Sequence, residues 1–464
     1  MSGQQNEINV VLCGDSTEVL RGYPDAFFDS VVCDPPYGLS KEPDIAEVLT
    51  KWLAGEPYDH GHGGFMGKAW DSFVPHPDLW REVFRVLKPG GHALVFAGTR
   101  TQDLMTIALR LGGFEIRDVI EWLYFSGFPK STDVSKQFDK RKGGASFVGE
   151  FSALIKRIRV EKGITVGFMD REVCGGSTNY SWFEGRPKGT RLPQLSEYIK
   201  IKELLGLDDT YDEMMEEAER EVVGKAKWAT LKEAPMPGAD CSADNRIVRD
   251  ITAPTTELAR KWDGWGTALK PAHEPIIVAR KPLAGTVVAN VEAHGTGAIN
   301  IDACRIGRSE GDRTEYGVTG DEGNPTVNTF GQRERVAYIP DDAGRFPANA
   351  ITTDADAFYS PYFNVSPAEL SKKASKRDRN TCADGSVLTG INVHPTVKPI
   401  DLMRWLITLV TPPGGITLDP FAGSGTTLVA AAQDGFNYVG IEQAPEHVAI
   451  INARLNVSAE TEAA

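Results

Sequence analysis

The residues of this chain that are best placed for chemistry are four in a row, Asp34-Pro35-Pro36-Tyr37. They follow an apolar run, 30–33, that predicts a short buried strand. The two prolines have a fixed φ and no N–H, so the turn after this strand is stiff. Such a turn can aim the Asp34 carboxylate, the Pro35 carbonyl and the Tyr37 ring at one point. Two acceptors beside an aromatic face suit a planar base with an exocyclic amino group, although the same residues could form an ordinary surface turn.

A second motif lies far downstream at 419–427, with the sequence Asp-Pro-Phe-Ala-Gly-Ser-Gly-Thr-Thr. The pattern predicts a strand at 416–418 before it and a helix at 428–434 after it. A glycine-rich turn between strand and helix lets a ligand approach the backbone near the helix N-terminus. The next predicted strand, 438–441, ends at Glu442, where a carboxylate can accept ribose hydroxyls. The loop lacks the third glycine of G-x-G-x-x-G and no phosphate-binding lysine follows, which disfavours a dinucleotide or NTP site.

Together these motifs resemble those of S-adenosylmethionine-dependent amino-methyltransferases, in particular beta-class DNA methyltransferases of the kind carried by phages and prophages. In that class the D/S-P-P-Y motif precedes the F-x-G-x-G cofactor motif, as it does here at 34–37 and 421–425. Asp15 follows the first predicted strand, where the class places its acidic contact to the cofactor adenine. The segment 394–399, His-Pro-Thr-Val-Lys-Pro, heads a helix as motif X does. The resemblance covers roughly 1–130, 262–283 and 390–455, about half the chain.

The resemblance implies S-adenosylmethionine as the cofactor and assigns residues to its site. Phe421, Gly423 and Gly425 would contact the methionine part, Glu442 the ribose and Asp15 the adenine. The remaining residues assigned to this site are Thr396 and Lys398 of motif X, with Asp419, Ser424 and Thr426 of the glycine-rich loop.

The expected chemistry is methylation of an amino nitrogen, whose lone pair is delocalised into the ring of the base. Asp34 and the Pro35 carbonyl can accept its two N–H groups and favour a tetrahedral nitrogen, so catalysis depends on positioning and electrostatics. Tyr37 would stack on the base after it is flipped out of the duplex. Cytosine-C5 methylation is disfavoured because the chain contains no Pro-Cys pair; Cys33 is expected in the core.

The hypothesis is therefore a DNA adenine-N6 methyltransferase. A cytosine-N4 methyltransferase is the alternative, since both reactions use the same acceptors; Asp rather than Ser at position 34 favours adenine. An alternative of another class is a catalytically idle DNA-binding or regulatory subunit that kept the fold. The core motifs alone also allow an RNA substrate, and the resemblance admits a homodimer and a cognate restriction endonuclease as partners.

Alternating strands and helices predict an α/β fold with a doubly wound sheet. The resemblance makes this a seven-stranded, Rossmann-like methyltransferase sheet in permuted motif order, with one antiparallel strand at its edge. Strands are expected at 8–12, 30–33, 92–97, 115–123 and 276–279, and helices at 79–87 and 101–111. The expected domains are the first part of the catalytic core at 1–130, a mainly helical insertion at 131–261, core edge strands at 262–283, a target-recognition region at 284–390, the cofactor-binding part of the core at 391–455, and a flexible acidic tail at 456–464.

The helical insertion resembles a Cro/repressor-type helix-turn-helix over 151–207. Helices are expected at 151–162, 165–174, 177–185 and 193–205, with 177–182 as the recognition helix in a major groove. A helical spacer that only packs on the core is the alternative.

The chain of 464 residues has a net charge of −14, which argues against a generic nucleic-acid binder. Binding of duplex DNA therefore requires basic residues to be concentrated locally, as they are at 140–142, 156–159 and 372–379. A glycine-rich loop at 55–72 is expected over the substrate cleft. The residues expected to contact DNA are Lys68, Ser177, Thr178, Asn179, Tyr180, Lys376, Arg377 and Arg379.

Composition indicates an ordinary globular protein, with 41% hydrophobic and 25% charged residues. The start of the chain is no signal peptide and no apolar stretch reaches membrane-spanning length, which predicts no membrane partner. Six scattered cysteines indicate reduced thiols in a cytoplasmic protein. A metal site is not expected, because His60 and His62 lack a third and fourth ligand at useful spacing.

Overall fold

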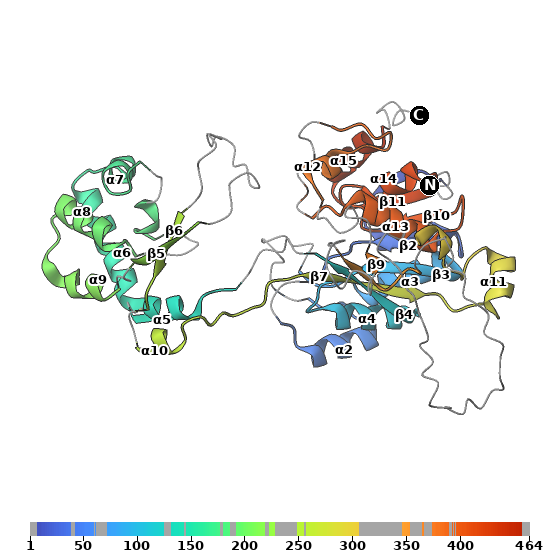
Figure 1. Ribbon diagram of the computed structural model, residues 1–464, viewed down its shortest axis with the longest axis horizontal. Helices are drawn as coiled ribbons and strands as arrows, with labels where there is room; N and C mark the ends of the chain where they lie inside the picture. Colours follow the sequence, from blue (N-terminus) through green and yellow to red (C-terminus); the bar gives the residue numbers. More distant parts are fainter. Residues whose placement is uncertain are drawn as a thin grey trace, which may run out of the picture. The chain divides into compact units, whose positions relative to one another are not determined.

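The chain divides into two compact units, which are described separately. Unit 1 comprises Met1–Gly127 with Ala272–Ala464, and unit 2 comprises Phe128–Pro271 (Figure 1). The computed structural model describes residues 7–38, 42–59, 61, 72–124, 131–142, 145–176, 180–185, 192–218, 222–227, 248–254, 257–305, 346–352, 364–365, 374–388, 392, 394 and 396–456. None of the described helices has the length and apolar character needed to span a bilayer.

Within its described residues, unit 1 is built on one sheet with the strand order β1-β11-β10-β2-β3-β7-β4-β8-β9. All neighbouring strands pair in parallel except β7, which is antiparallel to both β3 and β4. The strands are β1 (Val10–Cys13), β2 (Phe28–Cys33), β3 (Leu87–Phe96), β4 (Glu115–Leu123), β7 (His273–Arg280), β8 (Ala350–Thr352), β9 (Asn364–Val365), β10 (Ile416–Asp419) and β11 (Asn437–Glu442). This is the doubly wound, mostly parallel α/β sheet that the sequence predicts.

Two details of the predicted sheet are wrong. Seven strands come from the expected core, but the segment expected to recognise the target adds β8 and β9 beyond β4. The antiparallel strand β7 lies inside the sheet rather than at its edge. Its central residues, 275–279, are all buried, so this strand needs a neighbour on each side and a layer over each face.

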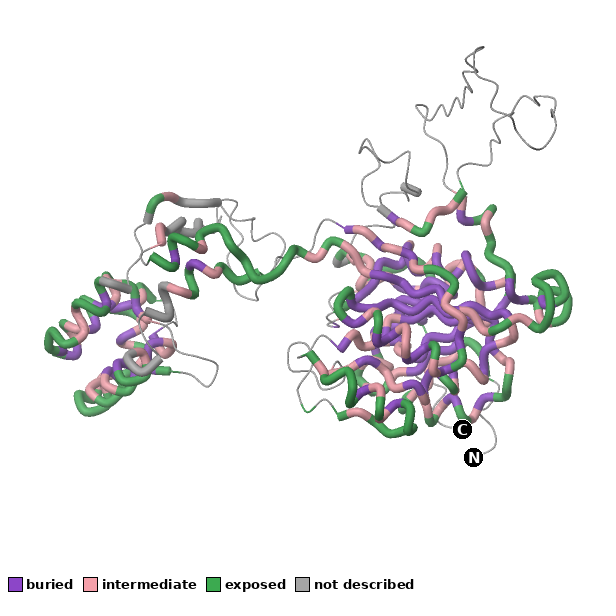
Figure 2. Tube along the Cα trace, turned by 90° about the horizontal axis from the view of Figure 1, so that it is seen from below, coloured by how far each residue is buried: buried purple, intermediate pink, exposed green. Residues whose placement is uncertain are grey.

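Helices cover both faces of the sheet because successive residues of the central strands point to opposite sides. On β2, Val31 belongs to one apolar core and Val32 to the other. Helices α2 and α4 lie on one side of the strands and α13 and α14 on the other (Figure 1), and the buried residues concentrate along the strands between them (Figure 2). The helices of unit 1 are α1 (Ser16–Leu20), α2 (Ile45–Ala54), α3 (Pro77–Val86), α4 (Gln102–Leu111), α11 (Val287–His294), η6 (Asp302–Cys304), α12 (Lys376–Asn380), α13 (Ile400–Val410), α14 (Thr426–Gln433) and α15 (Pro445–Leu455).

Lys281, which directly follows β7, ties the sheet to the end of α3. Its ammonium donates to the carbonyl oxygens of Phe84 and Leu87, each at 2.7 Å. A lysine at a helix C-terminus meets carbonyls that have no partner within the helix and the negative end of the helix dipole. Its burial lowers the pKa of Lys281.

We expect Lys281→Met to lower the free energy of unfolding of unit 1 by about 2 kcal/mol, because two carbonyls lose a charged donor. Urea denaturation followed by intrinsic fluorescence measures this loss. The matched control is Lys51→Met, since the Lys51 ammonium is solvent-exposed and pairs with Glu47 on the same helix. Equal unfolding midpoints for the two variants would contradict the structural role of Lys281.

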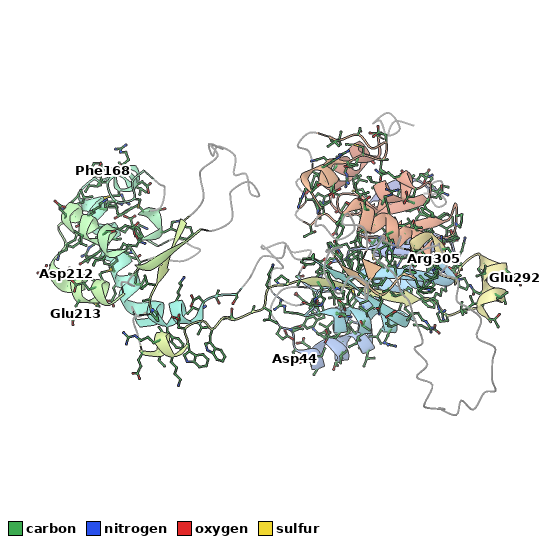
Figure 3. All side chains as sticks on the ribbon, in the orientation of Figure 1. Asp44, Phe168, Asp212, Glu213, Glu292 and Arg305 are labelled. Carbon is green, nitrogen blue, oxygen red and sulfur yellow. The ribbon has the colours of Figure 1, made fainter. Side chains whose placement is uncertain are left out.

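Unit 2 is mainly helical, with its own core and a two-stranded antiparallel ribbon. Asp212 lies at the start of α9 (Figure 3). Its carboxylate accepts a hydrogen bond from the Tyr198 hydroxyl at 2.7 Å and pairs with Lys202 at 2.6 Å. The elements are α5 (Val134–Lys142), α6 (Ala145–Glu161), α7 (Val166–Glu172), η3 (Tyr180–Trp182), α8 (Leu195–Leu205), η4 (Asp209–Tyr211), α9 (Asp212–Ala218), β5 (Val222–Lys227), β6 (Val248–Thr252) and α10 (Glu257–Lys261). Residues 262–271, expected among the core edge strands, group with this unit.

Tyr180 does not match the expected recognition helix. It begins η3, a single 3-10 turn of three residues, which is too short to lie along a groove as a recognition helix does. Its side chain is fully buried in the core of unit 2, with its ring 5.8 Å from that of Phe183. This burial does not favour the expected base contact by Tyr180, which stays a prediction. Ser177, Thr178 and Asn179 lie outside the described residues.

Candidate active site

The carboxyl end of β2 places the Asp-Pro-Pro-Tyr turn at the edge of the sheet. Asp34 follows the last residue of β2, and Cys33 before it is fully buried in the core, as expected. The Tyr37 hydroxyl lies 2.8 Å from Oδ1 of Asp34. The Tyr37 carbonyl accepts a hydrogen bond from the Thr101 hydroxyl at 2.5 Å, just before α4. The turn is thus held both by its own side chains and by the neighbouring helix.

Two charged residues from distant parts of the chain join Asp34 and Tyr37. The Lys398 ammonium lies 2.5 Å from Oδ2 of Asp34, 3.1 Å from the Tyr37 hydroxyl and 3.4 Å from Oε2 of Glu274. The Glu274 Oε2 atom is in turn 3.0 Å from the Tyr37 hydroxyl. The side chains of Lys398 and Glu274 are only 9% and 17% exposed. Two carboxyl groups, one ammonium and one phenol therefore share a nearly dry site.

Burial dominates the electrostatics of this group. It raises the pKa of Asp34, which Lys398 opposes and Glu274 reinforces. It also raises the pKa of Tyr37, and both carboxylates add to that increase, so Tyr37 stays a neutral hydrogen-bond donor. Burial alone would lower the pKa of Lys398, but Asp34 and Glu274 outweigh it and the pKa is raised. Lys398 is thus the positive charge that stabilises an ionised Asp34.

The glycine-rich loop lies beside this group because β10 and β2 are parallel neighbours, with Leu418 opposite Val31. Asp419 ends β10 and is 2% exposed; burial raises its pKa to about 7. The Glu442 carboxylate at the end of β11 accepts hydrogen bonds from the backbone N–H groups of Gly423 at 2.8 Å and Ala444 at 2.9 Å. Those two bonds fix its orientation before any ligand arrives.

The backbone of this loop requires glycine at two positions. Gly423 has φ +55° and Gly425 has φ +79°, both in the left-handed region that other residues avoid. A Cβ on Gly425 would lie 2.7 Å from Cγ2 of Ile451. The Ser16 hydroxyl, next to Asp15, donates to the Pro420 carbonyl at 2.5 Å, which brings the Asp15 turn to the same loop. A glycine-containing loop with carboxylates at Asp15, Asp419 and Glu442 fits a cationic nucleoside such as S-adenosylmethionine.

Other residues expected at the cofactor site lie elsewhere or face the protein. Lys398 pairs with the Asp34 carboxylate, and its assignment to the cofactor stays a prediction. Ser424 and Thr426 are buried against Arg454 of α15, whose guanidinium donates to the Ser424 carbonyl at 2.6 Å and the Thr426 hydroxyl at 3.2 Å. Thr396 is exposed in the segment before α13.

The residues expected to contact DNA are only partly described. Arg377 on α12 is exposed, whereas the Arg379 guanidinium donates to the His394 carbonyl at 2.7 Å and so braces motif X. Lys68 lies outside the described residues, and the Lys376 side chain is not described. Among the described residues, no three His, Cys, Asp or Glu side chains group as a metal site would require.

Glu274 and Arg454 contact residues of the candidate site, and the sequence analysis did not predict either. Glu274 comes at the beginning of a strand, whereas acids are usually sought after strands, at their carboxyl ends. Because β7 is antiparallel, its beginning reaches the same edge as the ends of β2 and β10. Arg454 looks like a surface residue of a C-terminal helix, yet it is completely buried and burial lowers its pKa to about 10.

Comparison with known proteins decides the family. The model of the N6/N4 DNA methylase family matches residues 28–142 and 138–453. The chain belongs to this family. Its members depend on S-adenosylmethionine, in agreement with the cofactor expected from the sequence.

The relatives with assigned names match parts of the chain. The type II methyltransferase M.HindIII of Haemophilus influenzae is 27% identical over 186 residues, which is 39% of this chain and 40% of that protein. The type II methyltransferase M2.DpnII of Streptococcus pneumoniae is 43% identical over 68 residues, or 15% and 25% of the two chains. The match thus spans less than half the length of either relative. The solved M1.HpyAVI–SAM complex aligns over 96% of this chain and 98% of that one, with 12% identity and a TM-score of 0.34.

Proposed function

We propose that this protein transfers the methyl group of S-adenosylmethionine to the N6 amino group of adenine in duplex DNA. The observation that carries the proposal is the meeting of Asp34 and the glycine-rich loop at the ends of two neighbouring parallel strands. A methyl-transfer site needs an acceptor for the target amino group next to the cofactor pocket. The order of the two motifs supports the beta class, and the phage-like character stays a prediction.

The chain's own residues supply positioning and charge. Asp34 and the Pro35 carbonyl would accept the two N–H groups of the target, which keeps the nitrogen lone pair directed at the cofactor. The cofactor, when bound, supplies an electrophilic methyl group on a sulfonium. Tyr37 would stack on the flipped base, and burial of the site strengthens each electrostatic contact. Asp34 must be ionised for this role, which Lys398 favours.

A cytosine-N4 methyltransferase is the second candidate, since the family covers both targets. Asp rather than Ser at position 34 supports adenine. A catalytically idle DNA-binding subunit is disfavoured, because an intact buried acid and an ordered glycine-rich loop would serve no purpose there.

The direct test incubates the protein with labelled cofactor and DNA lacking modification, and then identifies the methylated nucleoside.

A restriction–modification role is the biological context that we propose, because two relatives bear the names of type II methyltransferases. It implies site-specific methylation of DNA and a cognate restriction endonuclease as partner. Plasmid passaged in a host that expresses the protein and lacks other methylation would be mapped at base resolution. Methylation confined to one sequence context supports the role, and methylation without sequence context contradicts it.

We expect cofactor binding to depend on pH through the buried acid Asp419. S-adenosylmethionine is cationic, so it binds more tightly when Asp419 is ionised, and the pKa of Asp419 in the free protein is about 7. Affinity should therefore rise by about tenfold between about pH 6 and about pH 8. Calorimetric titration of the wild type and Asp419→Asn tests this, because the variant should bind weakly and without this dependence. Asp434→Asn is the control, since Asp434 pairs with Arg404 at the far end of α14. A wild-type affinity that does not change with pH would contradict the expectation.

A further inference from the structure

Glu274 lies in the active-site group without belonging to either motif. It is the second residue of β7, and its register partner on β4 is Trp122. Its Oε2 atom is within hydrogen-bonding distance of the Tyr37 hydroxyl at 3.0 Å and 3.4 Å from the Lys398 ammonium. Tyr37 and Lys398 are also contacts of Asp34. The two carboxyl groups thus share these two partners.

The two carboxyl groups compete for one hydroxyl hydrogen and one positive charge. Tyr37 has one hydroxyl hydrogen, and that hydrogen can be donated to Asp34 or to Glu274 but not fully to both. Lys398 is one positive charge facing two carboxyl groups. Ionised together, Asp34, Glu274 and Lys398 would leave a net negative charge in a site that is almost closed to water, which is costly. The ionisation state of Asp34 therefore depends on the ionisation state of Glu274.

Glu274 is also a second acceptor for Lys398, which becomes necessary when a substrate binds Asp34. Oδ2 of Asp34 is occupied by Lys398 and Oδ1 by Tyr37. A target amino group that binds Asp34 must share or replace one of these bonds. A buried ammonium cannot be left without a partner. Glu274 is close enough to keep Lys398 paired when Asp34 turns to the target.

We propose that Glu274 is a positioning residue for methyl transfer, which holds Lys398 and Tyr37 so that Asp34 can exchange one of its bonds for the target amino group. This inference rests on the proposed function. Glu274 and Lys398 have opposite electrostatic effects on the Asp34 carboxylate. Glu274 carries a charge of the same sign and destabilises it, whereas Lys398 carries the opposite charge and stabilises it. The other titratable groups facing Asp34 are Tyr37, Asp419 and Cys33. The Tyr124 hydroxyl faces Glu274.

The experiment measures the single-turnover rate of methyl transfer from acid to alkaline pH for Glu274→Gln, Glu274→Ala and Lys398→Met. The acid limb of the profile reports ionisation of Asp34. Glu274→Gln removes a like charge, so this limb should move to lower pH by about 1 unit; Lys398→Met should move it to higher pH by at least as much. Glu274→Ala loses the contacts as well and should lower the plateau rate on the order of 10²-fold, which Gln at 274 partly restores.

Glu115→Gln is the matched control. Glu115 lies at the other end of β4, where it pairs with Arg280 at 2.8 Å. This variant should keep the wild-type profile. Thermal unfolding and calorimetric cofactor binding show that each variant is folded and binds S-adenosylmethionine.

The possible results separate the two proposals. Opposite shifts for Glu274→Gln and Lys398→Met support the inference. Identical profiles for Glu274→Gln and the wild type would overturn the inference, as would shifts in the same direction for both variants. Neither result would contradict the proposed methyltransferase activity. A folded wild type that binds cofactor and methylates no DNA overturns the proposed function instead.

Discussion

Asp34→Asn should slow methyl transfer by about 10²–10³-fold and leave cofactor binding and folding intact. The carboxylate is expected to accept an N–H group of the target, and the asparagine amide offers one weaker acceptor and no negative charge. Loss of one preorganised polar group in a dry active site costs about 10²–10³-fold in rate. Lys398 keeps Glu274 as a partner in this variant, so the buried ammonium is not left alone.

The measurement is a single-turnover assay with labelled cofactor and saturating DNA, alongside calorimetric binding of the cofactor. Asp25→Asn is the control, because the Asp25 side chain is 77% exposed and pairs with Arg85 far from the site. A rate for Asp34→Asn close to that of Asp25→Asn would show that Asp34 is not the acceptor.

Gly425→Ala should remove cofactor binding almost completely. The residue has φ +79°, and the new Cβ would lie 2.7 Å from Cγ2 and 3.1 Å from Cγ1 of Ile451. Ile451 is buried in the core on α15 and cannot move aside without opening that core. The loop must therefore shift, and we expect the affinity for S-adenosylmethionine to fall by on the order of 10²-fold.

Gly435→Ala separates the clash from the backbone strain. Gly435 follows α14 and has φ +75°, but a Cβ there meets nothing within 4 Å. Both variants bear a similar conformational penalty, and only Gly425→Ala changes the loop. Calorimetric titration should show wild-type affinity for Gly435→Ala. Equal loss in both variants would indicate general destabilisation instead of a local change at the cofactor loop.

Much of the core could be predicted from the sequence, because its motifs are local. Asp34 and the glycine-rich loop each directly follow an apolar strand, and the structure has β2 and β10 at those positions. Strand β4 has the bounds 115–123 that the pattern predicts. In these segments the hydrophobic periodicity, the turn residues and the observed packing all indicate the same strands.

The missed features depend on contacts between distant residues. Lys398 and Asp34 are far apart in the chain, and no spacing rule indicates that the ammonium of Lys398 pairs with the Asp34 carboxylate. Glu274 could be placed only by knowing that β7 runs antiparallel inside the sheet. The burial of Tyr180 could not be predicted for a different reason. An aromatic residue in a short polar segment is compatible with a groove or a core, and its packing against Phe183 is a tertiary contact.

The central claim is tested most directly by identifying the methylated nucleoside. Unmodified DNA would be incubated with the protein and labelled S-adenosylmethionine, digested to nucleosides and separated by chromatography with mass detection. We predict label in N6-methyladenine, and about 10²–10³-fold slower labelling with Asp34→Asn. Label in N4-methylcytosine would support methyltransferase activity and show that the target base is cytosine instead of adenine. Absence of label from every nucleoside, with a folded protein that binds the cofactor, would contradict the account.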